Sequence, residues 1–418
     1  MTAAFDKMRF KNSFYPIIVI SLCAAYLFYK YVLQIYPSVI TEQLTREYNL
    51  TATGLGFLVG TYYYTYMFTQ LVSGVLIDKY GARYLSSIAL FCCAIGVLIF
   101  GNTHSLPVAA LSRGLMGFGV AFATVAYMKL AAGWFPPRQY AFVGGLLASA
   151  AMAGAFCSQA PLSYMVDMLG WRQCLFVVGI IGLVLTLLFL FVVRDAPTDN
   201  PHSNVLESYR VEMKDILSVL KSKQNLLLTF YAGLAFSPIA IFGGCWGNPF
   251  LEQAYQLTKT ETASMISLIF VGFGVGSPII GILSDKLGNR RNVLIISTLI
   301  ACAAVSAVIY LPLPTWLLMS ALLLFGFALG AYMLVFAIGK ELNLPLLTGT
   351  VIAMINASDP VITGITEPMI GKILDLTWAG GIENGVHIYT LQQYHLAMSV
   401  LPLYLLLGAI LLIWVDND

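Results

Sequence analysis

Long apolar runs separated by short polar loops are the dominant pattern along this chain. A helix that crosses the hydrocarbon core of a bilayer takes about 20 residues, and each run is long enough for one. The pattern predicts twelve spans. They cover residues 14–38, 54–77, 84–103, 107–133, 140–165 and 172–194, then 225–249, 261–283, 292–311, 314–339, 346–373 and 393–415.

A polar stretch divides the spans into two sets of six. We expect an N-terminal bundle over 1–194, a solvated linker over 195–224 and a C-terminal bundle over 225–418. A short amphipathic helix is expected over 206–220, on the membrane surface. The predicted fold class is an all-α membrane protein with twelve transmembrane helices in two pseudo-symmetric bundles.

Composition supports a lipid environment and excludes several function classes. The chain is 59% hydrophobic and 10% charged, whereas soluble domains are about 25% charged. The seven cysteines lie in apolar runs without a Cys-x-x-Cys pair, and the four histidines are scattered, so no metal site is expected. The sequence has no phosphate-binding loop and no nucleophile–base pair. We therefore expect neither an enzyme nor a cofactor, and a monomer that binds a small solute and lipid but no nucleic acid.

The distribution of Lys and Arg predicts the orientation. If the N-terminus is cytoplasmic, most basic loop residues fall inside, and only Arg46, Arg172, Lys259 and Lys372 fall outside. Positive charge favours the cytoplasmic side. Both termini are thus expected in the cytoplasm, with the protein in a plasma membrane of the bacterial inner-membrane type.

The two halves repeat a loop motif between their second and third spans. "GVLIDKYGAR" begins at Gly74 and "GILSDKLGNR" at Gly281, with Gly, Leu, Asp, Lys, Gly and Arg at the same offsets. Two similar halves in the same orientation indicate parallel repeats related by an axis along the membrane normal.

This paired motif resembles the major facilitator superfamily, as do "SRGLMGFG" at 112–119 and "GWR" at 170–172. The first glycine of each loop motif is expected to allow close helix approach at the cytoplasmic ends. Each Asp can pair with the Arg of its own motif or cap a neighbouring helix N-terminus. The resemblance implies that the residues of this cluster latch the two halves together when the inside is closed. These residues are Gly74, Asp78, Arg83, Gly281, Asp285 and Arg290. The alternative is that the charges only set topology. The "GFGVG" at 272–276 lies inside a span and indicates close helix packing.

Ionisable residues inside a span are candidate functional groups. In the eleventh span, Asn356, Asp359, Thr363 and Glu367 share one helix face at about 3.6 residues per turn. Pro360 directly follows the first acid and loosens the helix there. We predict that Asp359 and Glu367 form a proton-coupling pair, with Asp359 as the carrier. Glu367 is also expected to pair with Lys30 when substrate is absent; helix-end or backbone bonding of both acids is the structural alternative.

The first span carries Lys30 between tyrosines. Tyr26, Lys30, Leu33 and Gln34 resemble the first helix of the organic-anion symporter branch, where the basic residue holds the substrate carboxylate. An alternative is that Lys30 snorkels outward. The fourth span has Val120 where that branch often carries a proton-coupling Glu, so the coupling acid must lie elsewhere.

Other candidate substrate contacts are polar or aromatic residues of neighbouring spans. They are Tyr66, Arg113, Gln159 and Asn356. For Arg113, stabilisation of the fourth helix is the stronger interpretation, and Lys129 is either functional or a snorkelling end residue.

The sequence thus predicts a secondary transporter that takes up a small organic anion by alternating access and proton symport. An exporter of drugs, metabolites or siderophore-like compounds and a non-transporting membrane sensor are the alternatives.

Overall fold

A computed structural model describes residues 14–136, 139–195, 213–344, 347–383 and 386–416 of the chain. The helices of the N-terminal half are α2 (Tyr15–Ile35), η1 (Tyr36–Val39), α3 (Thr41–Tyr48), α4 (Ala52–Tyr80), α5 (Ala82–Asn102), α6 (Leu106–Val120), α7 (Ala123–Trp134), α8 (Tyr140–Cys157), α9 (Ala160–Leu169) and α10 (Trp171–Val192).

The C-terminal half repeats this order after the linker. Its elements are α11 (Met213–Lys221), α12 (Lys223–Ile241), η5 (Phe242–Trp246), α13 (Gly247–Tyr255), α14 (Lys259–Leu287), α15 (Arg290–Tyr310), α16 (Thr315–Leu329), η6 (Gly330–Met333), α17 (Leu334–Glu341), α18 (Thr348–Thr377), β1 (Ile382–Glu383), β2 (Val386–His387), α19 (Leu391–Met398) and α20 (Val400–Leu412). Apart from loops, the described residues are otherwise helical, as predicted, and the two strands, of two residues each, pair in a hairpin. The first part of the predicted surface helix, 206–212, lies outside the described residues, and α11 covers the remainder, 213–220.

The twelve predicted spans coincide with helices of the structure. In the described part of the chain, ten membrane-crossing segments are both long enough and apolar enough. The two exceptions are α4 and α18. At 29 and 30 residues they are long enough to cross. Their lower hydropathy reflects the tyrosines of α4 and the acids of α18, so both helices carry the polar groups that the sequence marked as functional.

Helix starts and loop turns follow from local chemistry. Thr258 and Glu261 form a capping box at the start of α14, which satisfies backbone donors that have no partner within the helix. Gly81 and Gly288, the second glycines of the repeated loop motif, have φ of +84° and +62°. Only glycine adopts such angles readily, and this explains its recurrence in both motifs.

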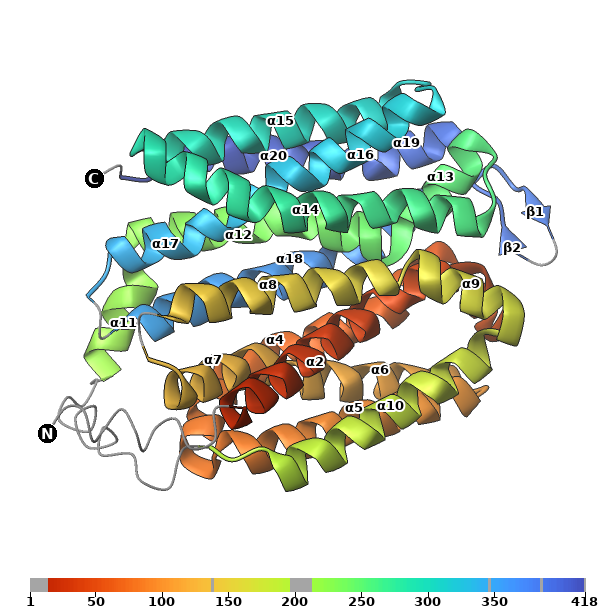
Figure 1. Cartoon of the computed structure of the whole chain (residues 1–418). Coiled ribbons are helices and arrows are strands. Elements are labelled where there is room, and N and C mark those ends of the chain that lie inside the picture. The colour runs from red at the N-terminus through yellow and green to blue at the C-terminus, as the bar shows by residue number, and fades with distance from the viewer. Residues whose placement is uncertain (1–13, 137–138, 196–212, 345–346, 384–385, 417–418) are drawn as a thin grey trace, which may run out of the picture.

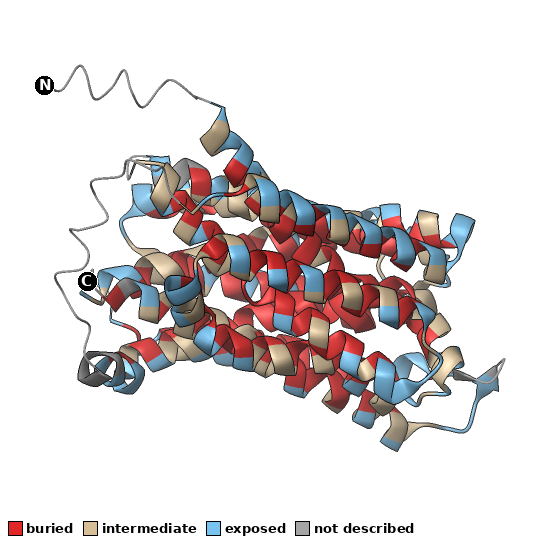
Figure 2. Ribbon diagram, turned by 90° about the horizontal axis from the view of Figure 1, so that it is seen from below, coloured by how far each residue is buried: buried red, intermediate tan, exposed pale blue. Residues whose placement is uncertain are grey.

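The two halves lie side by side as two bundles (Figure 1), with the red-to-yellow helices below and most of the green-to-blue helices above. The most extensive contacts between them are those of α4 with α18 and of α8 with α14. Buried residues concentrate inside the structure, while the outside is largely exposed (Figure 2). That outside carries large apolar side chains such as Leu71, Phe191 and Ile413, as expected for a surface that faces lipid.

Glycines allow helices of the C-terminal half to touch at the backbone. A Cβ at Gly272 would lie 2.2 Å from the carbonyl oxygen of Leu323, and one at Gly276 would lie 2.1 Å from that of Phe327. Replacement of either glycine would therefore push α14 away from α16. This confirms that the "GFGVG" segment packs helices together.

Both described chain ends, at the start of α2 and after α20, lie at one end of the bundle, which we call the terminal end (Figure 1). The opposite, distal end holds α3, α13 and the hairpin. Hydrogen bonds and ion pairs between the halves gather at the distal end, for example between Lys259 and Glu42 and between Thr260 and Asp167. The structure thus has its halves closed together at the distal end.

Candidate functional site

Lys30 lies buried in the middle of the protein, with 7% of its surface exposed. Its Nζ donates a 3.2 Å hydrogen bond to the hydroxyl of Tyr66 on α4. The same ammonium lies 4.9 Å from the ring centroid of Tyr31 and 5.0 Å from that of Tyr66. These cation–π contacts stabilise the charge. Lys30 therefore does not snorkel outward but sits in a tyrosine cage.

Asp359 faces this cage from α18, in the other half of the protein. Its carboxylate accepts a 2.8 Å hydrogen bond from Thr363, and Lys30 is the cation that acts on it electrostatically. The hydroxyls of Tyr31 and Tyr66 interact electrostatically with the same acid. The two charges predicted on separate spans thus belong to one central cluster, shared between the halves.

Tyr332 belongs to this central cluster and was missed by the sequence analysis. It is 5% exposed, and it interacts electrostatically with Asp359, Tyr31 and Tyr66. The tyrosine lies on η6, a short 3-10 segment that interrupts the predicted span 314–339. The clue in the sequence was Gly330, where the helix changes geometry and where a Cβ would lie 2.4 Å from the backbone nitrogen of Ser277.

Glu367 lies two turns farther toward the distal end of α18 and is fully buried. Neither carboxylate oxygen has a hydrogen-bond partner among the described residues. Its neighbours are the side chains of Cys245 and Trp246 on η5 and the guanidinium of Arg113. The expected pairing of Glu367 with Lys30 is therefore wrong for this conformation, because the rise of α18 brings Asp359, not Glu367, to the level of the lysine.

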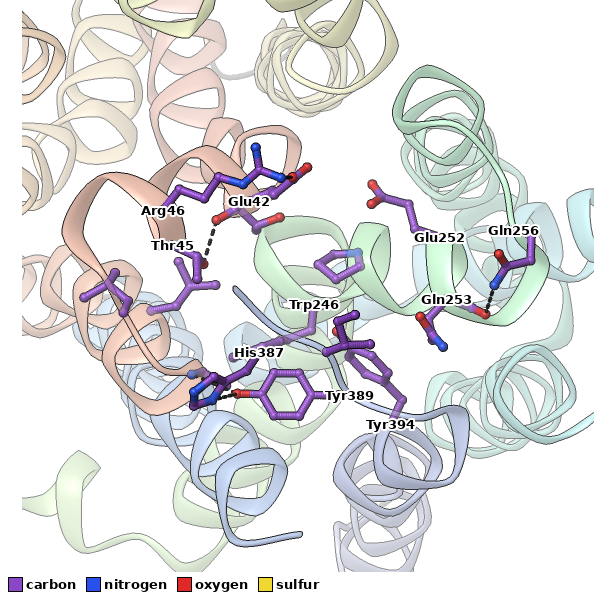
Figure 3. A pocket seen from close by; sticks show the side chains of 16 residues that line it. Glu42, Thr45, Arg46, Trp246, Glu252, Gln253, Gln256, His387, Tyr389 and Tyr394 are labelled. Atoms are coloured by element: carbon purple, nitrogen blue, oxygen red, sulfur yellow. Dashed lines mark hydrogen bonds and ion pairs between the residues drawn. The ribbon is translucent and has the colours of Figure 1, made fainter. Parts of the chain in front are cut away.

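Trp246 is the second unsatisfied group beside Glu367. Its indole Nε1 is buried and has no hydrogen-bond partner in the described part of the chain. The side chain also lines a distal pocket of about 340 Å³ that lies between the halves. Figure 3 shows Trp246 among the pocket residues, with Glu42 and Arg46 on one side and Glu252 on the other. The tryptophan thus lies between this pocket and Glu367.

Arg113 ties three helices of the N-terminal half together. Its guanidinium donates to the carbonyl oxygens of Leu33 at 2.8 Å and Val59 at 3.4 Å. It also lies over the rings of Tyr36 and Tyr62 at 5.3 and 4.8 Å from their centroids. This geometry fits the stabilising role that the sequence favoured.

Tyr26 and Gln34 make contacts within the N-terminal half. The Tyr26 hydroxyl donates to the carbonyl oxygen of Gly119 at 2.6 Å, which holds α2 against α6. Gln34 donates a long 3.5 Å contact to the hydroxyl of Tyr63. Of the first-helix residues that resemble the symporter motif, Lys30 lies in the central cluster, whereas Tyr26 points away from it toward α6.

Gln159 and Asn356 have different surroundings. Gln159 is buried and donates to the hydroxyl of Ser38 at 3.0 Å and to the carbonyl of Gly243 at 2.6 Å. Its carbonyl oxygen accepts from Asn248 at 3.1 Å, so it bridges the halves on the distal side. Asn356 is half-buried on α18, one turn before Asp359.

The loop motifs pair within their own halves at the terminal end. Arg290 binds Asp285 and Glu341, each at 3.2 Å, as predicted for the C-terminal motif. In the N-terminal motif the predicted Asp78–Arg83 pair is wrong. Asp78 instead pairs with Lys129 at 2.9 Å.

Arg83 is turned toward α10. It donates to the carbonyl oxygen of Leu190 at 2.8 Å, which explains why it does not reach Asp78. A Cβ at Gly74 or Gly281 would meet nothing within 4 Å. The predicted close approach at these glycines is therefore not present in this conformation, which is closed at the opposite end.

The sequence profile of the Major Facilitator Superfamily matches residues 18–246 and 239–418, which together span nearly the whole chain. The chain belongs to this superfamily. It is consequently a multi-pass membrane transporter-type protein and not an enzyme.

Curated relatives and solved structures agree with this assignment. A probable sulfoacetate transporter of Cupriavidus necator is 22% identical over 282 residues, 65% of each chain. The hexuronate transporter of Bacillus subtilis is 26% identical over 289 residues, 65% of this chain and 66% of that protein. The chain thus matches about two thirds of the length of these relatives.

The fold is also that of a bacterial homologue of the human lysosomal transporter Spinster, solved inward-facing and unoccupied. The TM-score is 0.76 at 15% identity, covering 95% of this chain and 96% of that one.

Proposed function

We propose that this superfamily member is a secondary transporter for a small organic anion, driven by proton symport into the cell. The observation that carries the proposal is the central cluster. Lys30, a buried cation, has tyrosine rings and a hydroxyl around it, and its anionic counterpart Asp359 lies on the opposite half. A cation that is taken out of water requires an anion. A substrate carboxylate or sulfonate meets that requirement when it enters.

Relatives that transport anionic solutes support the substrate class. Sulfoacetate carries a sulfonate and a carboxylate, and a hexuronate carries a carboxylate beside several hydroxyls. Lys30 would hold the acid group. Tyr31, Tyr66 and Tyr332 would supply hydroxyls for hydrogen bonds and ring faces for the rest of the solute.

Asp359 is the proposed proton carrier. It lies next to the substrate-binding cation, so its charge state and the bound anion influence each other through Lys30. With the acid ionised, it competes with the substrate for Lys30; with the acid protonated, the lysine is free for the substrate. Binding of a proton and of an anion would thus favour each other, which is the thermodynamic requirement for symport.

Glu367 is the second proposed proton site. It is fully buried without a hydrogen-bond partner in the described chain, and an unpaired buried carboxylate is costly in that state. Once the halves move apart and the carboxyl group ionises, the guanidinium of Arg113 and the indole N–H of Trp246 would stabilise the carboxylate.

We place the protein in a bacterial inner membrane, and the basic loops support an orientation in which the terminal end faces the cytoplasm. In that orientation the structure is closed to the outside. The Asp285–Arg290 and Asp78–Lys129 pairs, each within one half, are then the latch groups in their released state.

Uptake into proteoliposomes tests the proposal. Radiolabelled sulfoacetate and a hexuronate serve as probes, with an inward proton gradient imposed by a pH jump. Accumulation above the external concentration that is abolished by a protonophore is the expected result. Accumulation only under an outward-directed proton gradient would indicate export, and binding without any uptake or exchange would indicate a sensor.

A further inference from the structure

The N-terminus of α4 is capped by a carboxylate from the other half of the protein. Asp375, near the end of α18, accepts hydrogen bonds from the backbone N–H of Ala52 at 3.1 Å and of Thr53 at 2.8 Å. It also accepts from the hydroxyl of Thr53 at 2.5 Å and from that of Tyr389 at 2.6 Å. Three of these four donors belong to the N-terminal half, so one side chain joins the halves.

α4 depends on this contact for its own helix end. The side chain of its N-cap residue, Thr51, accepts from the N–H of Gly54, and the first turn of α4 contains no acidic residue. The first N–H groups of a helix have no partner within the helix, and the helix dipole favours a negative charge beside them. Asp375 supplies both the acceptors and the charge, but only while α18 lies against α4.

Backbone contact surrounds the cap. A Cβ at Gly371 would lie 2.2 Å from the carbonyl oxygen of Ala52, and a Cβ at Gly56 would lie 2.4 Å from that of Glu367. These distances leave no room for side chains, so the two helices touch directly. The contact covers the helix segment that carries Glu367, which is fully buried beneath it.

Two other links across the distal end are more exposed. Lys259 and Glu42 form an ion pair whose side chains are 35% and 34% exposed, and Thr260 donates to the exposed Asp167 at 2.8 Å. Surface pairs of this kind contribute little, because water and salt screen them.

Gln159 also joins the halves in the interior, through Gly243 and Asn248. The cap by Asp375 differs from that bridge because it carries a charge and holds a helix N-terminus, with direct backbone packing around it.

We propose that Asp375 is the latch of the distal gate, defined as the α4–α18 contact around Ala52, Gly56 and Gly371. The hydrogen bonds of its carboxylate to the N-terminus of α4 set the fraction of molecules that are closed at this end. When the gate opens, water replaces the carboxylate at the helix N-terminus, so the favourable contact counts only in the closed state. The proposal goes beyond the proposed substrate and coupling ion and does not depend on either.

A distance measurement between the halves tests this latch. Spin labels are placed at Asn102→Cys and Leu311→Cys, at the distal ends of α5 and α15, in a background without the native cysteines. Pulsed dipolar spectroscopy then reports the distal-closed and distal-open populations of the purified protein without substrate or gradient. Loss of a helix cap typically costs about 0.5–2 kcal/mol. Asp375→Ala should therefore raise the open-to-closed ratio about 2- to 30-fold, at tenfold per 1.4 kcal/mol.

Two further variants keep the test decisive if Asp375→Ala folds poorly. Asp375→Asn retains the shape and loses the charge, and Tyr389→Phe removes one donor that orients the carboxylate; both should shift the ratio in the same direction by less. Asp167→Asn is the matched control, because it removes another distal acid that contacts the opposite half, and it should change the ratio less than about twofold. Unchanged distances in the folded Asp375 variants, or an equal shift in Asp167→Asn, would overturn the latch.

Discussion

Replacement of Lys30 by Gln removes the positive charge of the central cluster while keeping a side chain of similar length. In the structure Lys30 is 7% exposed, donates to Tyr66 and acts on Asp359 from across the interface. If Lys30 holds the substrate anion, the Gln variant keeps one hydrogen-bond donor and loses the electrostatic attraction. We therefore expect anionic solutes to bind more weakly, while they still reach the central cluster.

The size of the loss follows from the contact that is removed. A hydrogen bond to a charged group contributes about 1.5–3 kcal/mol. At 1.4 kcal/mol per tenfold change, the dissociation constant should rise by about one to two orders of magnitude. Lys30→Arg keeps the charge but has a planar head that fits the tyrosine cage less well. It should therefore retain part of the affinity.

Isothermal titration calorimetry of the purified protein with sulfoacetate and a hexuronate measures this change. Lys30→Gln also leaves Asp359 without the cation that acts on it electrostatically, and a buried charge without a compensating one destabilises the fold. The double variant Lys30→Gln/Asp359→Asn removes both charges and should regain thermal stability without regaining affinity. Wild-type affinity in Lys30→Gln would refute the assignment of Lys30 as the anion site.

Three other changes test the alternation between the two closed states. Gly56→Ala should favour the distal-open state or destabilise the protein, because its Cβ would collide with the Glu367 carbonyl oxygen; the labelled-pair distances check this. Gly74→Ala, on the same helix, should fit the present state without strain and disfavour closure at the terminal end. The distances between the spin labels should therefore show an unchanged or larger distal-closed population. Asp78→Asn breaks the ion pair with Lys129 and should slow transport with little change in equilibrium affinity, as measured by exchange rates and calorimetry; a large rise in dissociation constant with unchanged turnover would contradict it.

Much of the fold was readable from local sequence signals. Helix ends follow caps such as Thr258, and the repeated motif identifies a turn that needs positive φ at Gly81. The spans of α4 and α18 were found despite their polar residues, because the apolar runs around these residues are long enough to cross.

The breaks inside helices were not predicted. η5 and η6 interrupt apolar runs without a proline at the break, and they place Trp246 and Tyr332 against the acids of α18. Their geometry depends on how neighbouring helices pack, for instance where Gly330 meets Ser277. A single sequence shows that a glycine is present at position 330 but does not show which residue packs against it.

The pairing of charges was predicted only in part. Helix periodicity placed Asp359 and Glu367 on one face of the same helix, and the structure adds that only Asp359 interacts with Lys30. Which acid of α18 lies near Lys30 depends on how far α2 and α18 are shifted along their axes relative to each other, and this shift is set by tertiary packing. The same reason explains why Asp78 pairs with Lys129, from another helix of its half, and not with Arg83 of its own loop.

Proton-driven accumulation by Asp359→Asn tests the central claim most directly. The variant removes the titratable group beside Lys30 and leaves the cation and its tyrosine cage in place. Proteoliposomes are loaded with either buffer or unlabelled hexuronate, and uptake of labelled hexuronate is followed with and without an inward proton gradient. We predict that gradient-driven accumulation disappears while exchange of external for internal solute continues. Accumulation by Asp359→Asn that still depends on the proton gradient would contradict the account and move the carrier role elsewhere, with Glu367 the next residue to replace.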